Sequence, residues 1–180
     1  MATQVLYSAI QQSEFFDFFN CHEINSITLS SSLVVKKVKP GGFQEYIDLE
    51  FHLKGDEIEK AQLILDRSWI GDQKHVNPFA KDITKSFIAT IVPSNEKHLV
   101  ESLVEHLFRL KGYKDIVYYI HQKEPLPSPS SEILQVVDVF LGNKPSTKFL
   151  LARSYFQIEN QVQNEESYFS ISWLNVPFNE

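Results

Sequence analysis

The segment Ser94–Gly112, SNEKHLVESLVEHLFRLKG, is the most strongly patterned part of this 180-residue chain. Its apolar residues recur at steps of three and four, the spacing that lines one face of an α-helix. They are Leu99, Val100, Leu103, Val104, Leu107, Phe108 and Leu110. Ser94 or Asn95 can cap the start and Gly112 can end the helix, so we expect a helix at about 95–111. Its apolar face must pack on something, and the flanking strand patterns indicate a sheet.

Two further helices are predicted from capping signals. Asn77 followed by Pro78 is a specific helix start, and apolar residues at four-residue spacing follow it, which predicts a helix at about 78–92. Residues 86–92 are rich in β-branched side chains, so a strand is the alternative there. Ser13 precedes EFFDFFN and predicts a short N-terminal helix. We interpret its four phenylalanines as part of the core, with a partner surface as the alternative.

Strand patterns occupy most of the remaining chain. Residues 43–54 alternate between apolar and polar side chains, which is typical of an antiparallel sheet with one solvent-exposed face. Strands at 27–39 and 58–70, the latter carrying Trp69, complete a three-stranded meander. Further strands are predicted at 115–121, 133–141, 147–158 and 168–174, and residues 5–10 are weakly strand-like. We expect a single α+β domain over 1–180, in which a mostly antiparallel sheet of about six to seven strands carries two helices on one face.

Composition excludes several classes of protein. The net charge is −6 and the chain has no basic block, which argues against nucleic-acid binding. The only cysteine, Cys21, cannot form an internal disulfide, which fits a reducing, cytoplasmic setting. The sequence has no signal-peptide pattern and no apolar run of about 18 residues, so we expect no membrane span. Residues 122–131 are rich in proline and serine and predict an exposed loop.

The loop from Asp66 to Asn77, DRSWIGDQKHVN, is the leading candidate site, because it leads from a strand into a helix N-terminus. Free N–H groups at a helix start attract anions. The candidate ligand-binding residues are Arg67, Trp69, Lys74, His75 and Asn77. The alternative is that Asp66 pairs with Arg67, Trp69 is buried, and the rest is an ordinary surface loop.

Two other groups of residues suggest chemistry only weakly. His98, Glu101, Glu105 and His106 lie at helical spacings that could ligate a metal, but a solvated charged face explains them fully. Cys21 lies beside a histidine and a glutamate, yet a lone cysteine is more often a small buried residue than a nucleophile. No glycine-rich phosphate loop or catalytic motif is present, so we expect no cofactor and no bound metal.

Aromatic residues fall on both predicted sheet faces. A second copy of the chain could cover the face without helices, which predicts a homo-oligomer; the N-terminal phenylalanines and the loop at 122–131 are the alternative cover. We therefore expect a non-enzymatic, self-associating binding module with a protein partner or a small anionic ligand. The alternative is a small enzyme or anion-binding protein with its site at 66–78, using Arg67, Trp69, His75 and His121.

Overall fold

The computed structural model describes residues 4–71, 76–92, 94–108, 131–151 and 153–176. Within these ranges the chain forms one seven-stranded antiparallel sheet with the order β1-β2-β3-β4-β7-β6-β5. The strands are β1 (His22–Thr28), β2 (Val34–Lys39), β3 (Ile47–Lys54), β4 (Glu57–Asp66), β5 (Ser146–Leu151), β6 (Ser154–Gln163) and β7 (Glu166–Leu174). The predicted α+β class and the mostly antiparallel sheet are confirmed.

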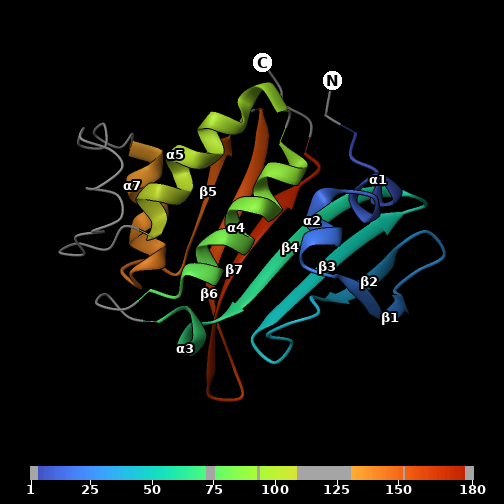
Figure 1. Ribbon diagram of the computed structural model, residues 1–180, viewed down its shortest axis with the longest axis horizontal. Helices are drawn as coiled ribbons and strands as arrows, with labels where there is room; N and C mark the ends of the chain where they lie inside the picture. Colours follow the sequence, from blue (N-terminus) through green and yellow to red (C-terminus); the bar gives the residue numbers. More distant parts are fainter. Residues whose placement is uncertain (1–3, 72–75, 93, 109–130, 152, 177–180) are drawn as a thin grey trace.

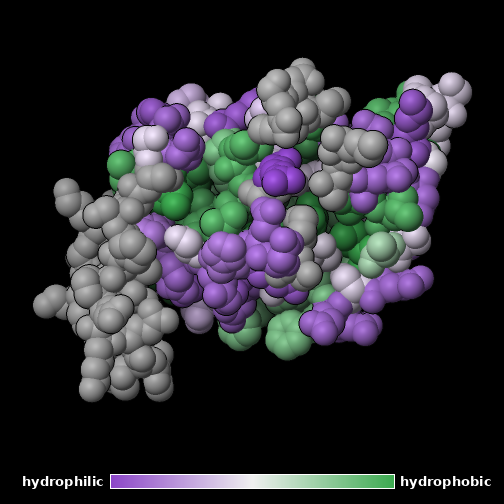
Figure 2. Space-filling view, turned by 90° about the horizontal axis from the view of Figure 1, so that it is seen from above, coloured by the Kyte–Doolittle hydropathy of each residue, from purple (hydrophilic) through white to green (hydrophobic). Residues whose placement is uncertain are grey.

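Helices pack on one face of this sheet (Figure 1). They are α1 (Tyr7–Gln11), α2 (Glu14–Phe18), α3 (Arg67–Ile70), α4 (Pro78–Ile91), the 3₁₀ turn η1 (Ser94–Glu96), α5 (Lys97–Phe108) and α7 (Ser131–Phe140). Figure 2, seen from above Figure 1, shows hydrophobic side chains in two areas with hydrophilic ones around and between them. The surface at this end is therefore mixed rather than one large apolar patch.

The sheet consists of two meanders that meet at β4 and β7. Strands β1 to β4 follow one another in space, and β5, β6 and β7 do the same in the other half. Across the junction Leu63 pairs with Ile171, and Leu65 pairs with Phe169. All four side chains are at most 1% exposed, so the junction lies at the centre of the core.

The helices predicted from capping signals form as expected. Asn77 caps α4 by accepting a hydrogen bond from the backbone N–H of Phe79, and Ser13 caps α2 in the same way at Phe16. The apolar stripe of α5 is buried through Val100, Leu103, Val104, Leu107 and Phe108. The described part of the predicted helix at 95–111 is thus confirmed.

The prediction of a strand at 133–141 is wrong, because this segment is helix α7. Val136, Val139 and Phe140 are buried, which is the spacing of a helix that presents one face to the core. α7 packs on β5, β6 and α5. Tertiary packing therefore overrides the strand preference of its valines.

The strand predicted at 147–158 is in fact a hairpin of β5 and β6. Arg153 has a φ of 59° at the turn between them. β6 then continues to Gln163, beyond the end of the predicted strand. The next turn is tight, with Asn164 at φ 51° and Glu165 at φ 70°, the left-handed pair that a two-residue hairpin requires.

Three predictions for the N-terminal half also need correction. Residues 27–39 form two strands, since β1 ends at Thr28 and β2 begins at Val34. Residues 7–11 are a short helix, although Leu6 forms a bridge with Glu57. β3 begins at Ile47 and β4 ends at Asp66, so Phe43 and Trp69 both lie outside the strands to which the alternation assigned them. The strand predicted at 115–121 and nearly all of the loop at 122–131 lie outside the described residues.

Candidate functional site

A small cleft lined by aromatic side chains lies where α2, α3 and the start of α4 meet the loop before β3. Its volume is about 190 Å³. Its lining includes Phe18, Phe19, Phe43, Trp69 and Phe79, together with buried Ile47 and Ile83; we call it the aromatic cleft. Phe18 is 80% exposed, Phe43 46% and Phe79 53%. Because phenylalanine is usually buried, exposed phenylalanines that converge on one cleft indicate a binding surface.

The loop at 40–46 holds Phe43 in an unusual backbone conformation. Phe43 has a φ of 57°, which is uncommon for a bulky residue and costs about 1–3 kcal/mol. The N–H of Gly41 donates to the Phe19 carbonyl oxygen at 2.9 Å. The N–H of Tyr46 donates to the Phe43 carbonyl oxygen at 3.0 Å. A Cβ at Gly41 would lie 2.7 Å from the side-chain nitrogen of Asn20, so only glycine fits here without a shift. The loop therefore presents Phe43 at a fixed place.

The rings around Trp69 contact one another directly. The ring of Phe43 lies 5.4 Å from that of Trp69 and 5.3 Å from that of Phe79, measured between centroids. Tyr46 stacks on Trp69 with ring planes 7° apart. Aromatic pairs of this kind contribute about 0.5–1.5 kcal/mol each beyond their buried area. The exposed rings are thus part of a preformed cluster.

Asn77 connects the cleft to helix α4. Its side-chain amide donates to the Trp69 carbonyl oxygen at 3.2 Å, while its oxygen accepts from the N–H of Phe79 at 3.0 Å. Its own N–H donates to the Ile70 carbonyl oxygen at 2.8 Å. One side chain therefore fixes both Trp69 and Phe79, and Asn77 is a positioning residue for the cleft.

Arg67 is bound elsewhere, at the end of α7. Its guanidinium donates to the carbonyl oxygen of Phe140 and lies over the rings of Phe140 and Phe169, 4.9 and 5.6 Å from their centroids. Burial lowers the pKa of Arg67 from its ordinary value. Asp66 does not pair with it, because the Asp66 carboxylate accepts hydrogen bonds from the N–H and hydroxyl of Ser68. The guanidinium is thus already bound by other residues of the protein.

The structure brings together only part of the predicted ligand site. Trp69 lines the aromatic cleft, and Asn77 is hydrogen-bonded to its carbonyl oxygen without lining the cleft. Arg67 contacts α7, and Lys74 and His75 lie outside the described residues. The residues that the sequence analysis missed are Phe43, assigned to a strand, and Phe79, assigned to the buried stripe of a helix. The glycine pair before Phe43 was the available signal, since it permits a sharp turn.

The charged face considered for metal binding is engaged in ion pairs. Lys85 pairs with Glu101 at 3.1 Å and Lys81 with Glu105 at 2.5 Å, which links α4 to α5. The ring Nδ1 of His106 lies 2.7 Å from the Ser102 carbonyl oxygen. In the part of the chain that the structure describes, no three potential metal ligands cluster.

Cys21 sits against the core, and burial raises its pKa to about 12. A thiol with so high a pKa is almost entirely protonated near neutral pH, and only the thiolate is a good nucleophile. The local environment therefore offers no activation for a catalytic role.

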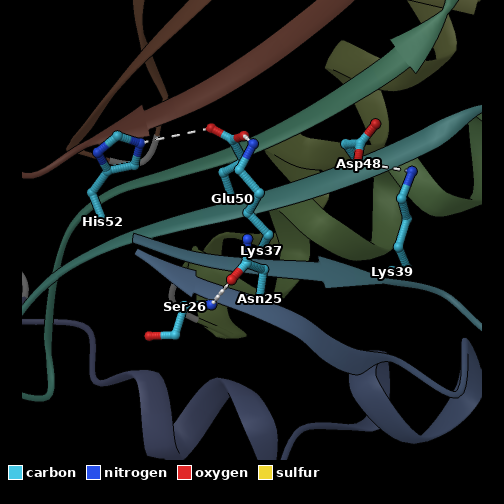
Figure 3. Close-up of polar contacts among 7 residues, drawn as sticks. All are labelled: Asn25, Ser26, Lys37, Lys39, Asp48, Glu50 and His52. Carbon is cyan, nitrogen blue, oxygen red and sulfur yellow. Dashed lines mark hydrogen bonds and ion pairs between the residues drawn. The ribbon is translucent and has the colours of Figure 1, made fainter. Parts of the chain in front are cut away.

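The sheet face opposite the helices is mainly polar. Figure 3 shows part of it, where Lys37 pairs with Glu50 at 3.0 Å and Lys39 pairs with Asp48 at 2.8 Å. Phe156, Phe169 and Trp173 point to the helices and are buried. Tyr155 and Tyr168 fall on the opposite face by strand alternation and are half-buried. An apolar second copy is thus not required to cover this face, and the predicted homo-oligomer stays a prediction.

Comparison with known proteins yields no relative. No protein-family model, no curated protein and no solved structure matches the chain. Among the described residues, no helix has both the length and the apolar character needed to span a bilayer.

Proposed function

We propose that the protein is a non-enzymatic interaction module that binds an apolar side chain of a protein partner in the aromatic cleft. The observation that carries this proposal is the convergence of exposed Phe18, Phe43 and Phe79 on Trp69. Aromatic residues are enriched at the centres of protein interfaces, where one anchor side chain in a pocket often dominates the binding energy.

The size of the cleft favours a side chain over a metabolite. Its volume of about 190 Å³ is below the roughly 300–1,000 Å³ of pockets that enclose drug-sized ligands. A larger groove between α2 and α4 shares Phe18 and Phe19 with the cleft. A partner segment with its anchor in the cleft would continue along this groove.

Selection from a displayed library of random peptides tests the proposal. Selected peptides should share one aromatic or branched aliphatic anchor, and binding should change the fluorescence of Trp69. Phe43→Asn is the informative variant, because asparagine tolerates positive φ. It should weaken binding at least about tenfold, which is about 1.4 kcal/mol.

Val162→Ser is the matched control, since Val162 is an exposed apolar residue on β6, away from the cleft. Peptides without an apolar anchor, or binding that survives both Phe43→Asn and Phe79→Ser, would refute the proposal. An anionic ligand at residues 66–78 is the second candidate from the sequence, and it would need a cation other than Arg67.

Self-association through β1 is favoured by a separate observation. β1 is an edge strand, and every one of its residues is exposed, including Ile24 at 50% and Ile27 at 38%. An uncovered edge can pair with the same edge of a second copy. Light scattering should report a dimer at micromolar concentration and a monomer for Ile27→Lys. A monomeric wild-type protein would exclude this contact.

A further inference from the structure

A second candidate site lies on the sheet face that none of the described helices covers. One row of side chains crosses five strands at matching register positions: Lys37, Glu50, Gln62, Ser172 and Gln157. The next row holds Asp48, Ile64, Ser170 and Glu159. The serines on β7 are short, whereas their neighbours on β4 and β6 are longer.

A groove of about 360 Å³ occupies this part of the face. Its lining includes Glu50, Gln62, Gln161 and Tyr168. The volume is within the roughly 300–1,000 Å³ of ligand pockets, but those pockets are mostly apolar. Here most of the lining side chains are polar, which fits a hydrophilic ligand.

Gln62 is the feature that points to a ligand. It is only 4% exposed, it lines the groove, and its side-chain amide has no hydrogen-bond partner within the described structure. The amide atoms themselves keep access to solvent, so they are open to a ligand in the groove. Ser172 pairs with Gln62 across the strands but does not itself line the groove. A ligand with hydroxyl groups would pair with the Gln62 amide.

The charged side chains in the groove lining are already in ion pairs. Glu50 pairs with Lys37 and Asp48 with Lys39 (Figure 3). A charged ligand would have to compete with one of these pairs, whereas a neutral ligand would not. The Tyr168 hydroxyl donates to Glu166, and this hydrogen bond raises the pKa of Tyr168 to about 12, so the hydroxyl stays neutral.

We propose that this groove binds a neutral oligosaccharide. The side-chain amide of Gln62 both donates and accepts, as sugar hydroxyls do, so it can pair with a hydroxyl in either direction. The half-buried ring of Tyr168 offers a flat surface for the C–H face of a sugar ring. The site is separate from the aromatic cleft and shares no lining residue with it.

An array of neutral oligosaccharides, together with sialylated and sulfated forms of the same cores, tests the proposal. Neutral sugars should bind, and calorimetry on the best of them should give an affinity that hardly changes with salt, since no ionic contact is made. Gln62→Met should weaken binding at least about tenfold. Gln11→Met, at an exposed glutamine of α1, is the matched control and should bind as the wild type does.

The unfolding free energy separates a ligand-binding role of Gln62 from a structural one. If the amide serves a ligand, Gln62→Met should be about as stable as the wild type, because the amide makes no hydrogen bond within the described structure that the substitution would remove. The absence of binding by any neutral sugar at millimolar concentration, a preference for charged forms, or unchanged affinity in Gln62→Met would overturn the proposal. Phe43→Asn should keep sugar binding, so this test is independent of the aromatic cleft.

Discussion

The guanidinium of Arg67 lies over the ring of Phe140 and donates to the carbonyl oxygen of the same residue. The two residues are 73 positions apart in the chain. Arg67 begins α3 directly after β4, and Phe140 ends α7. The contact therefore joins the N-terminal meander to the helix that covers β5 and β6. The carbonyl groups at a helix C-terminus carry partial negative charge, which favours a cation there.

Replacement of Arg67 should destabilise the fold. Arg67→Met keeps an apolar stem but loses the charged hydrogen bond and the cation–π contact, and we expect the free energy of unfolding to fall by about 2–4 kcal/mol. Urea denaturation measures this change. Arg153→Met, at an exposed arginine, is the control and should stay within about 0.5 kcal/mol of wild type. An equally small effect for Arg67→Met would show that the contact adds nothing to stability.

Asn77 should affect both stability and the environment of Trp69. Asn77→Ala removes the helix cap, and we expect a loss of about 1–2 kcal/mol. Asn77→Asp keeps the acceptor for the N–H of Phe79 but removes the donor to the Trp69 carbonyl oxygen. It should cost less stability and still shift the tryptophan emission. Identical denaturation midpoints for Asn77→Ala and wild type would contradict the cap.

The valines of α7 distinguish a helix from the strand predicted by the sequence. In a strand, Val137 and Val139 would share a face and Val136 would point away. In the helix, Val136 and Val139 are buried and Val137 is only partly buried. Val136→Ala and Val139→Ala should each cost about 1–2 kcal/mol and Val137→Ala clearly less. A large loss for Val137→Ala with none for Val136→Ala would favour the strand.

Cys21 should make the fold less stable at alkaline pH. Its pKa is raised by burial from 9.0 to about 12. Above pH 9 the unfolded chain loses this proton while the folded chain retains it, so the free energy of unfolding should decrease between pH 9 and about 12. Cys21→Ala should reduce that decrease in urea titrations at several pH values. Rapid alkylation of native protein by iodoacetamide at neutral pH would contradict the burial.

Local signals in the sequence predict the parts of the fold that depend on local structure. Asn77 before Pro78, and Ser13 before an acidic turn, identify helix starts because a cap needs only a neighbouring N–H group. The alternation of Ile47–Lys54 likewise identifies a half-buried strand. The turn at Arg153 contains no glycine, so the sequence predicts one strand where the structure has β5 and β6.

The candidate site was harder to predict, because its residues come from separate elements. Phe43 continues the alternation of β3 in the sequence, yet the turn after Gly42 directs it out of the sheet and onto Trp69. The sequence suggests that Arg67 is a cation available to a ligand. Its hydrogen bond to Phe140 depends on a contact between segments that are distant in the chain. Gln62 lies in an ordinary strand pattern, and only the register of β4 against β7 places it beside Ser172.

The β4–β7 pairing has a consequence for how the chain assembles. Every other strand pair in the sheet joins neighbours in sequence, whereas this pair alone unites the two meanders. A backbone cut between α5 and α7 would leave each meander on its own fragment. Fragment complementation, with recovery of the native circular dichroism spectrum on mixing, would then depend on the seam between Leu63 and Ile171.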